Sequence, residues 1–189
     1  VIKKDETSIV KTFSKDCFKV LWVGRFMYTK QLEIALRVMS KLTGLKNIEF
    51  HIVGKGFTDE ETQAMKAKAL EYGADSICHW HGQIPNSEVH RLMQESDIFF
   101  FTSIFEATST VILEAIQNGL PIVCFDRCGF GPIVDDKIGI KIPCKNPKQA
   151  VKDFSTAIDY IYHHREVLPG MSANCKGKRM ELSWYNKMT

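Results

Sequence analysis

The sequence lacks any run of about eighteen consecutive apolar residues, so no membrane-spanning helix is expected. The polar segment from Val1 to Asp16 contains no apolar stretch of the kind found in secretory signal peptides. An initiating Met is missing too, which indicates a piece of a longer protein. A hydrophobic content of 44% over 189 residues, with no low-complexity linker, excludes disorder. We therefore expect one domain, residues 1–189, with its own hydrophobic core.

A strong excess of charge of one sign is also missing. The formal net charge is only +3, far from the basic stripe of a nucleic-acid-binding protein, so no nucleic-acid partner is expected and an anionic ligand is favoured. Three of the six cysteines lie in or beside apolar runs that predict buried strands. We interpret all six as free thiols in a reducing compartment, which predicts a cytoplasmic protein: Cys17, Cys78, Cys124, Cys128, Cys144 and Cys175.

Several motifs of nucleotide-binding and catalytic proteins are absent. Neither the loop at Gly24 nor the loop Gly54-Lys55-Gly56 offers G-x-G-x-x-G, which disfavours an NAD-dependent oxidoreductase. There is no Walker A lysine motif and no G-x-S-x-G elbow. Residues 78–81 place two histidines on one strand face, but no carboxylate lies nearby at metal-ligand spacing, so no metal site is expected.

What the sequence does contain is a regular alternation of apolar runs and helical patterns. Helices are expected over Lys30–Leu42, from Thr58 to about Tyr72, after Pro85, from about Thr110 to Asn118, and over Pro147–His163 and Ala173–Lys187. Strands are expected at Phe18–Gly24, Ile48–Gly54, Ile77–Gly82, Asp97–Thr102, Pro121–Phe125 and Ile140–Ile142.

Strands that are separated by single helices pair in parallel through right-handed crossovers. The alternation therefore predicts an α/β fold, a doubly wound, Rossmann-like parallel sheet of about six strands with helices on both faces. Its core is expected over about residues 18–184. Ligands bind such sheets outside the carboxyl ends of the strands, so the loops that follow strands are the candidate sites.

The loop after the first expected strand carries two cations. Gly24 allows close approach of the backbone, and Arg25 and Lys30 follow it. Lys30 is expected at a helix N-terminus, where the helix dipole disfavours a cation unless an anion is also bound. A phosphate would resolve that conflict through both the helix end and the cations. The alternative interpretation is a pair of solvated surface cations.

The loop after Asp97–Thr102 carries two glutamates. Glu106 lies in the loop, and Glu114 lies about one turn inside the following helix. Thr108 and Ser109 are natural N-cap residues, so the helix start is expected to present free amides to an anion. Glu114 has the chemistry to accept hydrogen bonds from a diol such as ribose. The alternative interpretation is two solvated carboxylates.

These residues resemble the E-x7-E signature of the GT4 glycosyltransferases. The spacing Glu106-x7-Glu114 is followed by Ala115, then Asn118-Gly119-x-Pro121 and an apolar strand. Other family motifs match in the same order between Phe18 and Trp184: Gly24-Arg25 with Lys30, Gly54-Lys55-Gly56, the segment His81 to Pro85, the loop from Cys128 to Pro143, and Leu182-Ser183-Trp184.

The resemblance implies the C-terminal, donor-binding half of a GT-B fold, with the N-terminal acceptor domain absent from this chain. Family members retain anomeric configuration and generally need no metal, so no cofactor is expected. The implied ligand is a nucleoside-diphosphate sugar, with UDP expected before GDP. The implied reaction is transfer of a hexose to a glycan or a lipid-linked acceptor, as in polysaccharide biosynthesis. The full-length protein is then a candidate for peripheral association with the inner face of a membrane, and the isolated chain is expected to be inactive.

The resemblance also implies roles for individual residues. Arg25 and Lys30 would grip the donor diphosphate, and Glu106 would face the transferred sugar, so these are the expected catalytic residues. Glu114 would hold the ribose, and the backbone near Gly82 and Ile84 would meet the base. The remaining residues expected to bind substrate are Gly24, Gly54, Gly56, Thr108, Ser109 and Thr110.

Some positions depart from the family pattern. Gln31 and Ala107 stand where the family often has glycine, and Pro132 stands where it usually has an acidic residue. These changes leave the selectivity for the sugar open more than nucleotide binding. The alternative function is a non-catalytic, Rossmann-like module that binds a nucleotide or a protein partner.

Overall fold

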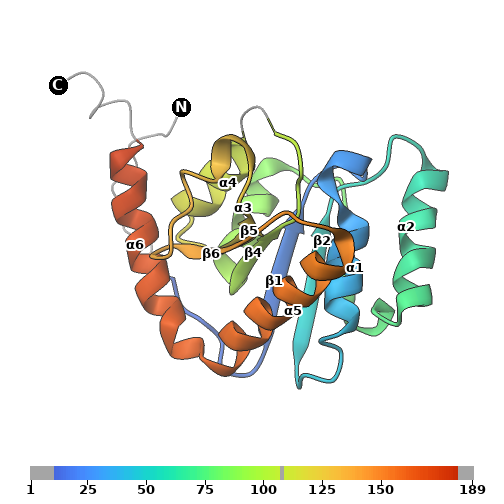
Figure 1. Ribbon diagram of the computed structural model, residues 1–189, viewed down its shortest axis with the longest axis horizontal. Coiled ribbons are helices and arrows are strands. Elements are labelled where there is room, and N and C mark those ends of the chain that lie inside the picture. The colour runs from blue at the N-terminus through green and yellow to red at the C-terminus, as the bar shows by residue number, and fades with distance from the viewer. Residues whose placement is uncertain (1–10, 107–108, 183–189) are drawn as a thin grey trace.

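The computed structural model describes residues 11–106 and 109–182 and is built on a six-stranded, all-parallel sheet (Figure 1). The strand order is β3-β2-β1-β4-β5-β6. The strands are β1 (Phe18–Val23), β2 (Ile48–Val53), β3 (Cys78–Gly82), β4 (Ile98–Phe101), β5 (Ile122–Phe125) and β6 (Gly139–Ile142). The predicted doubly wound sheet is confirmed. Its strand order changes direction between β1 and β4, the place where such sheets bind ligands.

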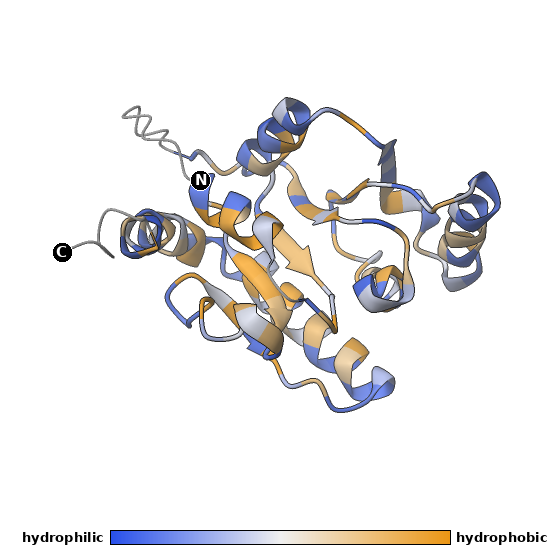
Figure 2. Ribbon diagram, turned by 90° about the horizontal axis from the view of Figure 1, so that it is seen from above, coloured by the Kyte–Doolittle hydropathy of each residue, from blue (hydrophilic) through white to orange (hydrophobic). Residues whose placement is uncertain are grey.

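Helices cover both faces of the sheet (Figures 1 and 2). They are α1 (Leu32–Ser40), α2 (Asp59–Tyr72), α3 (Asn86–Glu95), α4 (Thr110–Gln117), α5 (Pro147–His163) and α6 (Leu168–Glu181). Buried residues of α1, α2 and α5 share one apolar cluster, and buried residues of α3 and α4 share the other. Helix α6 contributes Leu168 to the first cluster and Cys175 to the second. Figure 2 shows the apolar residues gathered along the sheet and the polar residues on the outer sides of the helices.

The central strand β4 is apolar on both faces. Phe100 belongs to the first cluster and packs against Phe154 of α5, with ring centroids 5.0 Å apart. Phe101 belongs to the second cluster and packs against Phe130 at 5.1 Å. Burying each such ring contributes on the order of 1.5–3 kcal/mol. The phenylalanine run therefore forms core, and it is not available to stack on a ligand.

Two helix boundaries differ from the prediction. Lys30 lies in a 3-10 turn, Tyr28–Lys30, and α1 begins only at Leu32, after Gln31 in the left-handed region at φ 52°. The last helix begins at Leu168 instead of Ala173. Pro169 occupies the first turn of α6, where the missing N–H costs no hydrogen bond.

Candidate functional site

A cavity of about 220 Å³ opens at the carboxyl ends of the central strands. The loop after β1, the loop after β4, and the first turns of α3 and α4 form its wall. Seven of the residues selected from the sequence line it: Gly24, Arg25, Lys30, Glu106, Ser109, Thr110 and Glu114. The remaining lining residues are Val23, Asn86, Val89 and Val111. Loops far apart in the sequence thus bring two cations, two carboxylates and a helix start around one space.

The Lys30 ammonium forms an ion pair with the Glu106 carboxylate at the side of this cavity. Both side chains are largely shielded from solvent, with 22% and 13% exposed. Ser103 adds a second donor, because its hydroxyl donates to the same Glu106 oxygen at 2.8 Å. The ion pair therefore has a fixed position, with Glu106 held by two donors and Lys30 free to donate its other N–H groups.

Two buried residues that the sequence analysis did not select hold the backbone of Lys30 in place. The Thr102 hydroxyl donates to the Lys30 carbonyl oxygen at 2.8 Å, and it accepts a hydrogen bond from Trp22 Nε1 at 3.0 Å. These two hydrogen bonds connect Trp22 in the interior of β1 to the backbone of Lys30. Thr102 could have been selected as a polar residue that ends an otherwise apolar strand beside the predicted loop.

Arg25 carries a charge with no anionic partner among the residues that the structure describes. Its guanidinium lies over the ring of Phe57, 4.7 Å from the centroid. Phe57 itself is 64% exposed, so the pair projects toward solvent at the edge of the cavity. The charge of Arg25 is therefore available to a ligand, and stacking on Phe57 restricts its side chain before binding.

The start of α4 contributes the least satisfied group of the site. Ser109 occupies the N-cap position, as expected, but its hydroxyl makes no capping bond. Its Oγ is buried and has no hydrogen-bond partner within the described part of the chain. Leaving a buried hydroxyl without a partner costs about 1–3 kcal/mol, and such groups are rare in native structures. The expected cap residue Thr108 lies outside the described residues.

Glu114 points to the same cavity from the first turns of α4. Its carboxylate makes no ion pair or hydrogen bond with any residue in the ranges 11–106 and 109–182. The backbone oxygen of Glu114 accepts hydrogen bonds from the Asn118 side chain at 2.8 Å and from the Asn118 backbone N–H at 3.0 Å. The carboxylate is therefore free to accept hydrogen bonds from a ligand.

Four predicted site residues that the structure describes do not line the cavity: Gly54, Gly56, Gly82 and Ile84. A Cβ on Gly54, at φ 127°, would lie 1.8 Å from the Gly24 carbonyl oxygen, and a Cβ on Gly56 would lie 2.5 Å from Cβ of Glu61. Packing within the chain thus explains both glycines. Gly82 has φ 68° and accepts a hydrogen bond from the Gly54 N–H, while Ile84 packs against the second core cluster. Gly54 follows β2 and Gly82 ends β3, and both strands lie on the β1 side of the switch in strand order, next to the site.

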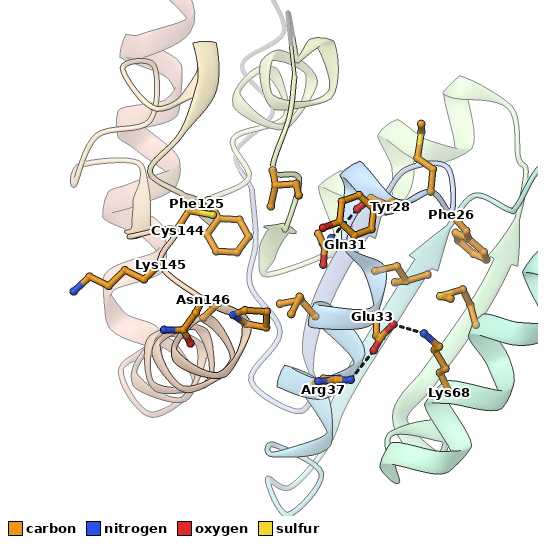
Figure 3. Close-up of a pocket in the computed structure, with 17 residues that line it drawn as sticks. Phe26, Tyr28, Gln31, Glu33, Arg37, Lys68, Phe125, Cys144, Lys145 and Asn146 are labelled. Atoms are coloured by element: carbon orange, nitrogen blue, oxygen red, sulfur yellow. Dashed lines mark hydrogen bonds and ion pairs between the residues drawn. The ribbon is translucent and has the colours of Figure 1, made fainter.

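A second, larger cavity of about 580 Å³ lies between α1 and α5 (Figure 3). The sequence did not predict it. Its acidic residue Glu33 is paired with Lys68 and with Arg37, the latter at 2.6 Å, and it accepts a hydrogen bond from the Tyr72 hydroxyl at 2.8 Å. Figure 3 shows these charged groups turned toward one another. The larger cavity therefore offers volume, but its charged groups on α1 and α2 already have partners.

The Rossmann-like sheet, with a cavity at its switch in strand order, places this chain among the doubly wound α/β domains, which bind their ligands at that switch. The particular family follows from comparison with known proteins. Residues 3–171 match the family model described as glycosyl transferases group 1, and the chain belongs to this family. The expected resemblance to the GT-B glycosyltransferases is confirmed.

An uncharacterized glycosyltransferase of Methanocaldococcus jannaschii is 26% identical over 129 residues, which cover 68% of this chain and 32% of that protein. Among solved structures, WaaG, a glycosyltransferase involved in lipopolysaccharide biosynthesis, superposes with a TM-score of 0.78 at 19% identity. The superposition covers 92% of this chain and 45% of the WaaG chain. The pneumococcal O-GlcNAc transferase in complex with UDP and GlcNAc superposes with a TM-score of 0.75 at 20% identity. That superposition covers 90% of this chain and 34% of the transferase chain. The chain thus spans about a third of the length of this curated relative.

None of the helices in residues 11–106 and 109–182 combines the length and the apolar character that a membrane crossing requires.

Proposed function

We propose that the 220 Å³ cavity binds the nucleoside diphosphate of a sugar donor, with UDP preferred over GDP. The observation that carries this proposal is the buried hydroxyl of Ser109 at the start of α4, which has no partner among the described residues. It lines the same cavity as Arg25, whose charge is not paired with any described residue. A phosphate oxygen accepts from a hydroxyl, from helix amides and from a guanidinium together, so one anion satisfies all three. The pneumococcal neighbour, whose structure contains UDP, supports the choice of nucleotide.

Arg25 and Lys30 are proposed to bind the diphosphate and to stabilise the negative charge that develops on the departing nucleoside diphosphate. Lys30 remains beside Glu106 and donates its other N–H groups to phosphate, since an ammonium has three donors. The two cations supply the positive charge that a divalent metal provides in other transferases, so we propose a metal-independent reaction.

Glu114 is proposed to accept hydrogen bonds from the ribose hydroxyls, because its carboxylate faces the cavity without a partner among the described residues. Glu106 is proposed to face the transferred hexose, and the backbone near Gly82 and Ile84 to meet the base. Thr110, beside Ser109, adds a further donor at the helix start.

The complete protein is proposed to transfer the sugar with retention of configuration to a glycan or a lipid-linked acceptor. The acceptor is expected to bind through a domain outside this chain, since the match covers only 32% of the relative from Methanocaldococcus jannaschii. Closure of two domains around the donor would exclude water and position the second substrate. The isolated chain is therefore expected to bind nucleotide and to transfer nothing, as a labelled-donor assay on the chain and on the longer protein would show.

Isothermal titration calorimetry with UDP, uridine, GDP and NAD tests nucleotide binding. We expect UDP to bind most tightly. The substitution Arg25→Ala should weaken UDP binding by about 1.5–3 kcal/mol, or about 10- to 150-fold, and should leave uridine binding nearly unchanged. Arg37→Ala is the matched control, because Arg37 is paired with Glu33 in the larger cavity. Equal losses for uridine and UDP, or tighter binding of NAD than of UDP, would contradict the proposal.

A further inference from the structure

Three histidines and a glutamate meet on one face of the sheet edge formed by β2 and β3. His51 of β2 lies directly opposite His79 of β3 in the parallel register. Phe50 and Ile52 face the core beneath α1, so the alternating residues Glu49 and His51 face the other side of the sheet. The carboxylate that is missing from the sequence neighbourhood of residues 78–81 is thus supplied by the adjacent strand, which corrects the interpretation made from spacing alone.

The side chains in this cluster are within ligand distance of one another. His51 Nε2 lies 2.9 Å from Glu49 Oε2, and one ligand atom from each of Glu49, His51 and His79 lies within 4.8 Å of the others. The rings of His51 and His79 stack with centroids 4.8 Å apart and an interplanar angle of 14°. Ligand atoms around a tetrahedral zinc ion lie about 3.3–3.5 Å apart, so small side-chain rotations suffice.

We propose that Glu49, His51 and His79 form a binding site for a divalent transition-metal ion, with Zn²⁺ as the preferred ion and water as a further ligand. Imidazole nitrogen and carboxylate oxygen are the donors that zinc accepts, whereas Mg²⁺ and Ca²⁺ prefer oxygen alone. No residue of the nucleotide cavity takes part, so this site is independent of the proposed function.

His81 contacts the ring nitrogen of His51 that does not face Glu49. Its Nε2 lies 2.9 Å from His51 Nδ1. A neutral imidazole carries one proton, so an ion on His51 Nε2 requires that proton on Nδ1, where it can be donated to His81 Nε2. Such a bond from the second ring nitrogen orients metal-bound histidines in proteins. The bound ion would link β2 to the edge strand β3 and stabilise the fold.

The proposal is tested with untagged, reduced protein titrated with ZnCl₂ and MgCl₂ by calorimetry, and with Co²⁺ followed by visible absorption. We expect one Zn²⁺ per chain, little Mg²⁺ binding, and the d–d bands of tetrahedral Co²⁺. His79→Ala and Glu49→Gln should each weaken Zn²⁺ binding at least about tenfold. His79 is exposed, so its removal should leave the fold intact.

His163→Ala is the matched control, because His163 is exposed on α5 and lies outside the cluster; it should bind zinc like the wild type. Absence of zinc binding to the wild type would overturn the proposal. Unchanged zinc binding by His79→Ala would overturn it as well, because the ion would then be held elsewhere, for example by the free cysteines. UDP binding by these variants should equal that of the wild type.

Discussion

Two cavities of this chain, one at the strand ends and one between α1 and α5, differ in size and in how well their polar groups are satisfied. The cavity between α1 and α5 is the larger of these two, at about 580 Å³, and its acidic residue Glu33 has three partners. The cavity at the strand ends is about 220 Å³, yet Arg25, Glu114 and the buried hydroxyl of Ser109 have no partner there among the described residues. Volume favours the first as a ligand site, and chemistry favours the second.

The contrast has a physical basis. A paired surface charge gains little from a new ligand, since it must first lose its present partner. A buried group without a partner gains the full hydrogen bond when a ligand arrives. The free-energy cost of removing that group from water has already been incurred on folding. Unsatisfied groups thus lower the stability of the unliganded protein and raise its affinity for a ligand that pairs with them.

The largest effect is expected at Gly54, which supports the backbone beneath the small cavity. Gly54→Ala would place a Cβ 1.8 Å from the Gly24 carbonyl oxygen at φ 127°, so the free energy of unfolding should fall by about 3 kcal/mol or more. Urea denaturation would measure this. Gly44→Ala is the control, because no atom lies within 4 Å of its added Cβ. Equal stability of the two variants would show that the close approach of β1 and β2 is not rigid.

The next effect separates the cations of the two cavities. Lys30→Ala should weaken UDP binding by about 1.5–3 kcal/mol, because a charged donor to phosphate is lost. Lys68→Ala removes a cation of the large cavity that is paired with Glu33, and UDP binding should be unchanged. Calorimetry on both variants decides between the cavities. A larger loss for Lys68→Ala would place the nucleotide between α1 and α5 instead.

A smaller effect is expected for the ribose. The wild type should prefer UDP over 2′-deoxy-UDP by about 1 kcal/mol, since Glu114 is left partly unpaired by the deoxy compound. Glu114→Ala should remove this preference while the thermal unfolding midpoint stays close to that of the wild type. Competition binding with the two nucleotides provides the measurement. Equal affinity of the wild type for both would exclude the ribose role.

The residues of the small cavity could be selected from the sequence because each lies where a strand ends. The alternation of strands and helices predicts parallel pairing, and parallel strands bring their carboxyl ends together. Arg25 and Glu106 therefore line one cavity although they lie 81 positions apart (106 − 25) in the sequence. The role of Thr102, which donates to the Lys30 carbonyl oxygen, was missed, although its place as the polar end of an apolar strand could have indicated it.

Features that depend on the pairing of distant segments were not predictable. The large cavity depends on how α1 packs beside α5, and neither helix encodes that distance by itself. The cluster of Glu49, His51 and His79 depends on the register between β2 and β3, and a shift of one residue would move the histidines of one strand to the opposite face. The left-handed conformation of Gln31, which separates Lys30 from α1, has no glycine to signal it.

The most direct test of the contrast between the cavities is one variant measured in two ways. Ser109→Ala removes the buried hydroxyl that lacks a partner among the described residues. We expect the unliganded variant to be more stable than the wild type in urea denaturation, and to bind UDP about 1 kcal/mol more weakly in calorimetry. These opposite signs identify a group kept for a ligand at the expense of stability. A variant that is less stable than the wild type and binds UDP equally well would contradict this interpretation, because Ser109 would then serve the fold alone.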